Sequence, residues 1–294
     1  MKVSSLVRLC RPKQWVKNTF VLLPLFFSGN LLNVPKLLEA VVAFVAFSLV
    51  SSAIYCLNDL RDAEADRQHP VKRLRPVASG EVGAKGCVGL MALLCAASFC
   101  LLLMLPRQQA VAAAAVIFIY LAMNIAYCLK LKSIALIDVV IISVGFVLRV
   151  VAGGVAAGIF ISHWIVLMTF LLALFLALSK RRDDIVIYNK TGVKMRRNIA
   201  RYNLEFMSQS TTLVATVMLI SYIMYTVSPE VVERFQSGLI YVTSLFVLVG
   251  LLRYMQLTVV DSSTGSPTRT LLHDRFIQLC LCGWALTFVA IIYF

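Results

Sequence analysis

Three carboxylates lie at helical spacing within one short segment of the sequence. Residues 58–66 read Asn-Asp-Leu-Arg-Asp-Ala-Glu-Ala-Asp, so Asp59, Asp62 and Asp66 follow one another at intervals of three and four positions. At about 100° per residue, an α-helix would gather them within an arc of about 60°. Like charges on one helical stripe repel one another, and Mg²⁺ relieves such repulsion because it binds carboxylate and phosphate oxygens. The spacing predicts a Mg²⁺ site at these three residues.

A stiff basic loop follows the carboxylates. Pro70 and Pro76 bracket it, and Lys72, Arg73 and Arg75 lie between them. Guanidinium groups match the geometry of phosphate oxygens, so carboxylates and loop together fit a magnesium diphosphate. The alternative is a solvated loop whose acids and bases pair, with its basic residues kept there by membrane topology. The spacing favours the diphosphate site.

Two ionisable residues fall inside an apolar stretch. Asp138 and Arg149 are eleven positions apart, which on a helix places them about 20° apart around the axis and about 16 Å apart along it. They are too distant to pair, so each needs another partner, because charge within a membrane span is costly. A substrate hydroxyl or a lysine suits Asp138. For Arg149, binding an acidic group and bracing the helix bundle are equally open.

Further cations are candidates for phosphate binding. Lys130 and Lys132 lie in a short connection, where they equally indicate topology. Residues 180–184 read Lys-Arg-Arg-Asp-Asp, and we assign the first two of these cations to the substrate. The cations of residues 190–201 are assigned to anionic lipid headgroups or solvent.

The chain as a whole is apolar and basic. Of its 294 residues, 60% are hydrophobic and 14% charged, its formal net charge is +14 and its mean hydropathy is +0.87. It is too hydrophobic to be disordered, and an ordinary soluble globule could not cover so much apolar surface. The charge is a minority component of an apolar chain, so we expect no nucleic-acid partner.

The hydropathy pattern predicts an all-α integral membrane protein. Nine stretches are long and apolar enough to cross a bilayer as helices, and no alternation of period two indicates a β-barrel. The expected spans are residues 15–32, 37–57, 86–105, 109–129, 134–157, 162–179, 206–227, 236–252 and 276–294.

Basic residues set the expected orientation, because cytoplasmic loops retain Lys and Arg. With the N-terminus in the cytoplasm and the C-terminus outside, 24 of the 28 Lys and Arg residues fall on the cytoplasmic side. The substantial polar loops 58–85, 180–205 and 253–275 are then all cytoplasmic, and we expect the last of them to help cover the site. One domain covers residues 1–294.

The carboxylate segment resembles the first aspartate motif of the UbiA superfamily of intramembrane prenyltransferases, Asn-Asp-x-x-Asp-x-x-x-Asp. The resemblance extends over nearly the whole chain and points to the polyprenyl-phosphate phosphoribosyltransferase branch. The stretches that carry it are Arg11-Pro-x-Gln-Trp-x-Lys-Asn18, Asp66-Arg-x-His-Pro-x-Lys-Arg-x-Arg-Pro76, Gly145-Phe-x-x-Arg-x-x-Ala-Gly153, Lys180-Arg181, and Gly265-x-Pro267 with Asp274-Arg275.

This resemblance implies a UbiA-type bundle of nine transmembrane helices that acts as a glycosyltransferase. The implied reaction is Mg²⁺-dependent transfer of the 5-phosphoribosyl group from phosphoribosyl diphosphate to a polyprenyl phosphate, for synthesis of a cell-envelope polysaccharide. The implied setting is the bacterial cytoplasmic membrane, with the active site at the cytoplasmic face. The length of the lipid tail, the polymer served and the oligomeric state stay open, a homo-oligomer included.

The resemblance also implies roles for individual residues. Asp59, Asp62 and Asp66 are the expected catalytic metal ligands, and Asn58 orients the metal shell or a ribose hydroxyl. The expected substrate-binding residues are Lys17, Arg67, Lys72, Arg73, Arg75, Tyr127, Lys130, Asp138, Arg149, Lys180 and Arg181.

One departure from the superfamily bears on the substrate, and two other functions stay open. Many relatives carry a second aspartate-rich motif spaced for a second metal contact, whereas this chain has only the adjacent Asp183 and Asp184, on different sides of a helix. A prenyltransferase that moves an allylic chain to a small acceptor would share the first motif but would prefer the second. A non-enzymatic transporter would place its binding groups near the bilayer midplane, where only Arg149 lies.

Overall fold

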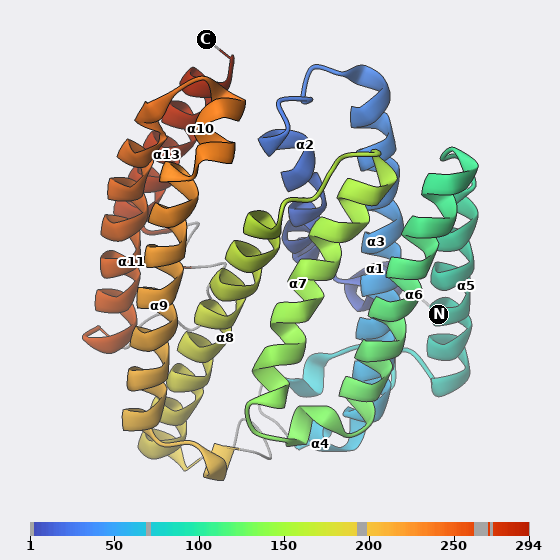
Figure 1. The fold of residues 1–294 in the computed structure, drawn as a ribbon. Coiled ribbons are helices and arrows are strands. Elements are labelled where there is room, and N and C mark those ends of the chain that lie inside the picture. The colour runs from blue at the N-terminus through green and yellow to red at the C-terminus, as the bar shows by residue number, and fades with distance from the viewer. Residues whose placement is uncertain (1–2, 69–71, 193–198, 262–269, 271–272, 294) are drawn as a thin grey trace. The chain divides into compact units, whose positions relative to one another are not determined.

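The computed structural model describes residues 3–68, 72–192, 199–261, 270 and 273–293. Within these ranges every regular element is a helix, as the hydropathy pattern predicts (Figure 1). The expectations for Pro70, Gly265, Pro267, Lys194, Arg196 and Arg197 lie outside the described residues.

The helices fall into two compact units, which are described one at a time. Unit 1 comprises Met1–Lys132 with Val144–Val166, and unit 2 comprises Ser133–Ser143 with Leu167–Phe294. The division runs through α7 (Ile137–Ala156), so the start of this helix belongs to unit 2 and the rest to unit 1.

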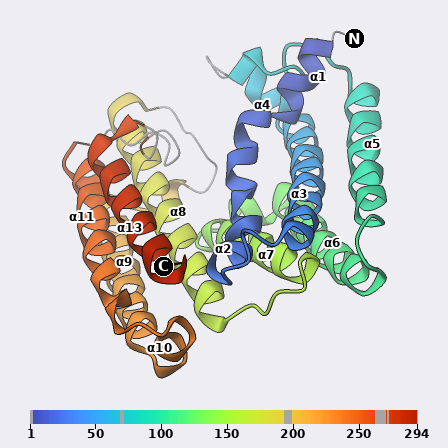
Figure 2. The ribbon, with the colours of Figure 1, turned by 90° about the horizontal axis from the view of Figure 1, so that it is seen from above.

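Unit 1 is built around α3, which packs along α5 and α6 (Figure 2). Small residues make this approach close: Ala43 and Ala46 of α3 are fully buried, and Ser98 of α5 donates a hydrogen bond to the Ala46 carbonyl at 2.8 Å. The α-helices before α7 are α1 (Val3–Cys10), α2 (Leu23–Phe27), α3 (Val34–Arg61), α4 (Ala63–Arg67), α5 (Ala84–Leu102) and α6 (Arg107–Leu129). Three 3-10 helices lie between them, η1 (Pro12–Leu22) after α1, η2 (Lys72–Leu74) after α4 and η3 (Leu131–Ser133) after α6.

The first apolar stretch is wound differently from the other helices. With three residues per turn, the 3-10 helix η1 places every third side chain on one face. Trp15, Asn18 and Val21 share the face that packs inward, and the latter two are buried. Trp15 Nε1 donates to Ser52 Oγ at 3.0 Å, and Asn18 Nδ2 donates to Ser48 Oγ at 2.9 Å. The 3-10 winding thus aligns η1 with a row of serines on α3.

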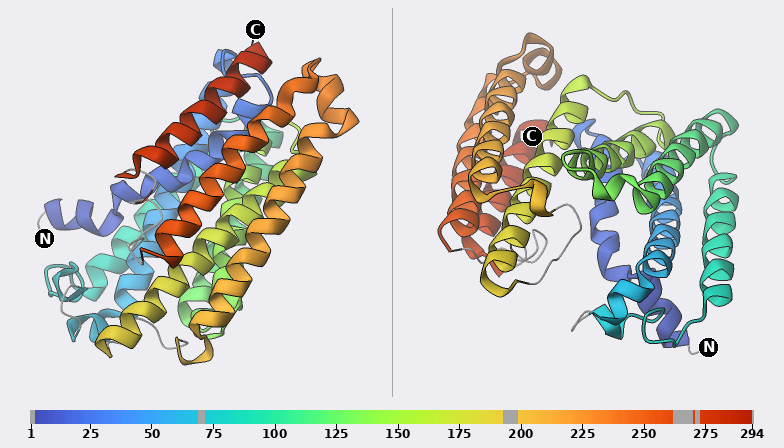
Figure 3. Two further views of the ribbon diagram at one scale, coloured as in Figure 1. Left: turned by 90° about the vertical axis from the view of Figure 1, so that its left-hand side faces the viewer. Right: turned by 90° about the horizontal axis from the view of Figure 1, so that it is seen from below.

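Unit 2 is a bundle of α9, α11 and α13 with most of α8 (Figure 3). Phe175 of α8, Met218 of α9 and Tyr254 of α11 are buried in one core. The elements are α8 (His163–Thr191), the 3-10 helix η4 (Ile199–Arg201), α9 (Leu204–Val227), α10 (Pro229–Phe235), the 3-10 helix η5 (Gly238–Val242), α11 (Thr243–Val259) and α13 (Arg275–Tyr293).

Seven of the nine expected spans appear as helices long and apolar enough to cross a membrane. They cover Val34–Arg61, Ala84–Leu102, Arg107–Leu129, Ile137–Ala156, His163–Thr191, Leu204–Val227 and Gly238–Val259. Of the other two, α13 contributes a shorter apolar stretch, Arg275–Ile291. The stretch 15–32 is η1 followed by α2, not one α-helix. At about 2.0 Å per 3-10 residue and 1.5 Å per α-helical residue, these two elements together extend about 30 Å.

Backbone contact between η1 and α7 depends on Gly153. A Cβ at this position would lie 1.7 Å from the Val21 carbonyl oxygen, far inside van der Waals contact. Only glycine therefore allows the two backbones to touch. Gly89 of α5 is the opposite case, because a Cβ there would meet nothing within 4 Å.

Gly153→Ala should lower the melting temperature of the purified protein markedly, because a backbone must move to admit the methyl group. Overpacking typically lowers the free energy of unfolding by about 1–3 kcal/mol, and we expect a clash with backbone atoms to lie at the upper end of this range. Gly89→Ala is the matched control and should leave the melting temperature unchanged or slightly raised. Equal melting temperatures for the two variants would contradict the contact.

Candidate active site

The carboxylate segment is not one continuous helix. α3 ends at Arg61 and α4 begins at Ala63, and between them the backbone of Asp62 (φ −93°, ψ 1°) leaves the helical region. The prediction that the three carboxylates lie along one face of a continuous helix is therefore wrong. Aspartate competes poorly for helix interiors because its side chain bonds to nearby backbone. The break at Asp62 lets the three carboxylates turn toward different cations.

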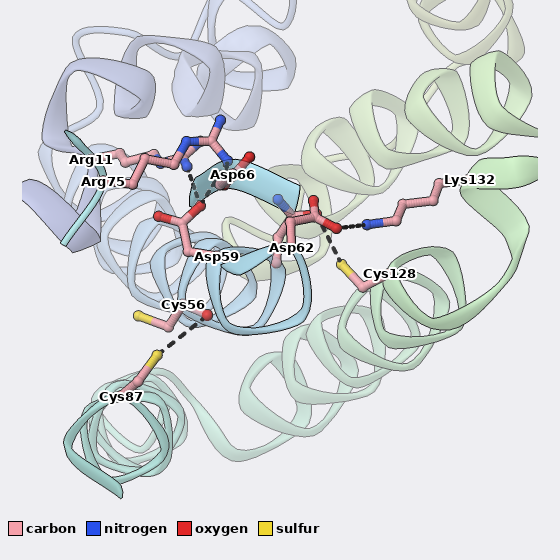
Figure 4. A network of polar contacts seen from close by, with 10 residues as sticks. Arg11, Cys56, Asp59, Asp62, Asp66, Arg75, Cys87, Cys128 and Lys132 are labelled. Atoms are coloured by element: carbon pink, nitrogen blue, oxygen red, sulfur yellow. Dashed lines mark hydrogen bonds and ion pairs between the residues drawn. The ribbon is translucent and has the colours of Figure 1, made fainter. Parts of the chain in front are cut away.

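Asp59 and Asp66 converge on one arginine. Arg75 Nη1 lies 3.2 Å from Asp59 Oδ1 and 2.7 Å from Asp66 Oδ2, and Arg11 also pairs with Asp59 (Figure 4). Both carboxylates are buried, with 2% and 4% of their surface exposed. Buried carboxylates need such partners, since desolvation otherwise disfavours their charge.

Asp62 faces the other way, toward the connection that follows α6. Lys132 Nζ lies 2.5 Å from Asp62 Oδ1, and both side chains are about one-third exposed or less (Figure 4). Beside them the Cys128 thiol contacts Asn58 Oδ1 at 3.8 Å. Asn58, which we expected at the metal shell, thus lies at the end of α3 next to these carboxylates.

These contacts make a formally neutral group of three acids and three cations inside unit 1. We call it the carboxylate cluster; its members are Arg11, Asp59, Asp62, Asp66, Arg75 and Lys132. Its cations come from separate segments before η1, after η2 and within η3. Charge-assisted bonds of this kind form equally well with phosphate, so each cation can exchange a carboxylate for a phosphate oxygen.

Arg11 is held in an unusual backbone conformation. Its φ of 51° and ψ of 58° are left-handed, which costs a residue other than glycine about 1–2 kcal/mol. Its guanidinium lies 5.0 Å from the centroid of the Tyr55 ring while it pairs with Asp59. Strained residues persist where surrounding contacts fix them, as they often do at functional sites.

Arg149 lies deeper in unit 1 and is satisfied by neutral groups. Its guanidinium donates to Asn18 Oδ1 at 2.8 Å, the Gly145 carbonyl at 2.7 Å and the Tyr120 hydroxyl at 3.1 Å. No carboxylate in the described ranges pairs with it. Three rings lie with their centroids 5.0–5.1 Å from its Cζ atom, those of Phe47, Tyr120 and Phe146. Of the two roles left open by the sequence, this geometry favours bracing the bundle.

Unit 2 holds a second buried group of charges. Arg181 Nε donates to Asp138 Oδ2 at 2.7 Å, and Arg181 Nη1 lies 3.3 Å from Asp184 Oδ2. The Tyr202 hydroxyl donates to Asp138 Oδ1 at 2.8 Å, and burial together with this carboxylate raises the pKa of Tyr202 to about 12. Asp138 and Arg181, both expected at the substrate, are 0% and 2% exposed.

Arg182 has a helix-capping role. Its Nη1 donates to the Thr258 carbonyl at 2.5 Å, its Nη2 to the Val259 carbonyl at 3.4 Å and its Nε to Ser208 Oγ at 3.1 Å. The two carbonyls belong to the last turn of α11, where a cation also offsets the helix dipole. Arg182 is therefore a structural cation.

The remaining expected substrate contacts are spread over both units. Arg67 donates to the Ala78 carbonyl at 3.2 Å. Two of the others, Arg73 and Lys130, are exposed. The half-buried ones are Lys17, Lys72, Tyr127 and Lys180.

Sequence reasoning identifies only part of the carboxylate cluster. Arg75 is among the residues predicted to bind the substrate. Arg11 is named only as part of the stretch 11–18, and Lys132 only as a candidate for phosphate binding. Tyr55 is not expected at all. The spacing of Tyr55 could have identified it, because it precedes Asp59 by four positions and so lies on the same helical face.

The carboxylates do not form a ready-made metal cage. Among the described residues, no three His, Cys, Asp or Glu side chains are grouped so that they could hold one ion. Mg²⁺ is usually held by one or two carboxylates together with substrate phosphates. The oxygen donors of Asp59, Asp62 and Asp66 fit an ion that arrives with a diphosphate.

Comparison with known proteins assigns the family. The profile of the UbiA prenyltransferase family matches residues 20–280. The chain belongs to the UbiA prenyltransferase family. A decaprenyl-phosphate phosphoribosyltransferase of Corynebacterium glutamicum is 34% identical, covering 98% of this chain and 87% of that protein. A protein of the same name from Mycolicibacterium smegmatis is 35% identical, covering 99% and 93%.

Solved structures of UbiA proteins share the fold. A UbiA homolog from Archaeoglobus fulgidus bound to GPP and Mg²⁺ superposes with a TM-score of 0.72 at 18% identity, covering 99% of this chain and 100% of that one. A digeranylgeranylglyceryl phosphate synthase gives a TM-score of 0.67 at 17% identity, covering 99% of each. The all-helical UbiA fold predicted from the sequence is thereby confirmed.

Lys132→Met should strengthen binding of free Mn²⁺ in the absence of substrate by roughly fivefold, because Asp62 loses a counter-charge worth about 1 kcal/mol. Opposite charges at this distance interact by a few kcal/mol, which partial exposure reduces toward about 1 kcal/mol. Isothermal titration with Mn²⁺ measures the effect. Lys85→Met, an exposed lysine at the start of α5, is the control and should change nothing. Weaker Mn²⁺ binding in Lys132→Met would contradict the pairing.

Proposed function

We propose that this protein transfers the 5-phosphoribosyl group from phosphoribosyl diphosphate to a polyprenyl phosphate. The observation that carries the proposal is the carboxylate cluster, which pairs oxygen ligands for a divalent ion with cations suited to phosphate. The resemblance to decaprenyl-phosphate phosphoribosyltransferases over nearly the whole chain supports the choice of both substrates.

The cations of the cluster would bind the donor by exchanging partners. Arg11 and Arg75 would turn from Asp59 toward diphosphate oxygens, for which forked guanidinium donors are well suited. Lys132 would leave Asp62 in the same way. Mg²⁺, held by the released carboxylates, would neutralise the charge that develops on the departing diphosphate. Asn58 would orient a ribose hydroxyl or the metal shell.

The transfer itself would need positioning more than acid–base chemistry. The acceptor phosphate is already an anion, so no strong general base has to activate it. The carboxylate cluster accordingly combines carboxylates with permanent cations, and none of its members is a histidine. Fixed charges placed where the leaving group develops its own charge lower the barrier.

The other expected contacts divide by burial. Two of them are exposed, Arg73 and Lys130, and four are half-buried, Lys17, Lys72, Tyr127 and Lys180. These six residues and Arg67 stay predicted to bind the substrate. Their charge and accessibility suit a polyanionic donor.

We place the enzyme in a bacterial cytoplasmic membrane with nine spans, a cytoplasmic N-terminus and the active site at the cytoplasmic face. Seven long apolar helices support this directly. The combined length of η1 and α2 is close to the thickness of the hydrocarbon core, about 30 Å, and α13 would supply the ninth span. The excess of Lys and Arg in alternate loops supports the orientation.

The proposal predicts a lipid-linked ribose phosphate when the purified protein is incubated with labelled phosphoribosyl diphosphate, a polyprenyl phosphate and Mg²⁺. Asp59→Ala and Asp62→Ala should each reduce product by at least about a hundredfold, because charge stabilisation of the leaving group is lost. EDTA should have the same effect on the unaltered protein.

Glu64→Ala is the matched control, since Glu64 is an exposed carboxylate in the same segment and should keep full activity. Consumption of an allylic diphosphate without any lipid-linked ribose phosphate would replace the proposal with a prenyltransferase. Full turnover in both aspartate variants would contradict the assignment of the carboxylates.

A further inference from the structure

The buried carboxylates of unit 2 already contain a cation of their own. Arg181 bridges Asp138 and Asp184, at 2.7 Å from Nε and 3.3 Å from Nη1 respectively. All three residues are buried, with 2%, 0% and 8% exposure. Two buried carboxylates with a cation between them is an arrangement that oxygen-binding metals also adopt. Here a guanidinium occupies the cation's position.

The hydrogen bonds in this group suit a guanidinium and not a metal. Both oxygens of Asp138 are used, one by Arg181 and the other by the Tyr202 hydroxyl at 2.8 Å. Arg181 Nη2 is buried and finds no partner among the described residues. That atom is an N–H donor, whereas a metal requires a lone pair. A divalent ion would also meet the positive charge of Arg181 directly.

The group also fixes a strained turn at the start of α7. Leu136 has a φ of 65°, which is costly for any residue except glycine. Its backbone N–H donates to the Tyr202 hydroxyl at 2.6 Å, and that hydroxyl donates to Asp138. Arg181 therefore acts through Asp138 and Tyr202 on the backbone that opens α7.

We infer that Arg181 is the permanent counter-cation of this group, and that the described residues of unit 2 bind no divalent metal. Arg181 is then a positioning residue and not a phosphate ligand. The inference refines the proposed function, on which it rests for the role of the metal. Among the described residues, it assigns divalent-ion binding to the carboxylate cluster of unit 1.

Mn²⁺ alone, counted by electron paramagnetic resonance on the purified full chain, tests the inference. Asp59→Asn and Asp62→Asn together remove the carboxylate cluster as a metal site, and this double variant should bind no Mn²⁺ at millimolar concentration. Adding Arg181→Met to it should create one Mn²⁺ site, because the cation between Asp138 and Asp184 is removed. A further Asp138→Asn should abolish that site.

Two matched variants separate this effect from a general loss of charge. Arg181→Lys keeps the positive charge and should create no site in the double variant. Arg182→Met removes the adjacent arginine, whose bonds to described residues are all to neutral acceptors, and should likewise create none.

The inference is overturned if the double variant still binds Mn²⁺ and loses it on Asp138→Asn, Asp183→Asn or Asp184→Asn. That comparison decides the matter even if Arg181→Met fails to fold. A folded Arg181→Met variant without a new ion would also overturn it. Failure of the proposed function would appear in the transfer assay and would leave these ion counts unchanged.

Discussion

The repulsion among the three carboxylates of residues 59–66 is the constraint on which the rest of unit 1 depends. Two of them are almost fully buried, so each must have a counter-charge. Arg11, Arg75 and Lys132 supply it from three separate segments, which the pairing ties to the end of α3. The left-handed backbone at Arg11 and the break at Asp62 both lie where these charges meet.

The same electrostatic problem is solved twice in the chain, with different consequences. In unit 1 the cations are partly exposed, with 26–27% of the Arg11, Arg75 and Lys132 side chains accessible, so they can exchange partners with a charged substrate. In unit 2 the counter-cation Arg181 is 2% exposed and locked between two acids. A mobile pairing suits binding and release, whereas a buried one suits fixed geometry.

The sequence predicts the helical membrane fold and nine spans, of which seven appear as long apolar helices, because hydropathy is a local property. It also places three acids within one short segment, and their role as metal ligands stays a prediction. It does not predict partners, because these depend on which helices meet. Asp138 pairs with Arg181, 43 positions away, and Arg149 with Asn18, 131 positions away. The 3-10 winding of η1 is likewise matched to its contacts with Ser48 and Ser52 on α3. No local sequence pattern predicts these contacts.

The most direct test of the account is a structure of the protein with phosphoribosyl diphosphate and Mg²⁺ bound. The separation of Lys132 Nζ and Asp62 Oδ1, 2.5 Å without ligand, is the quantity to measure. The account predicts that this pair opens, with Asp62 facing the metal and Lys132 contacting a phosphate oxygen. An intact Lys132–Asp62 pair with the donor bound elsewhere would contradict it.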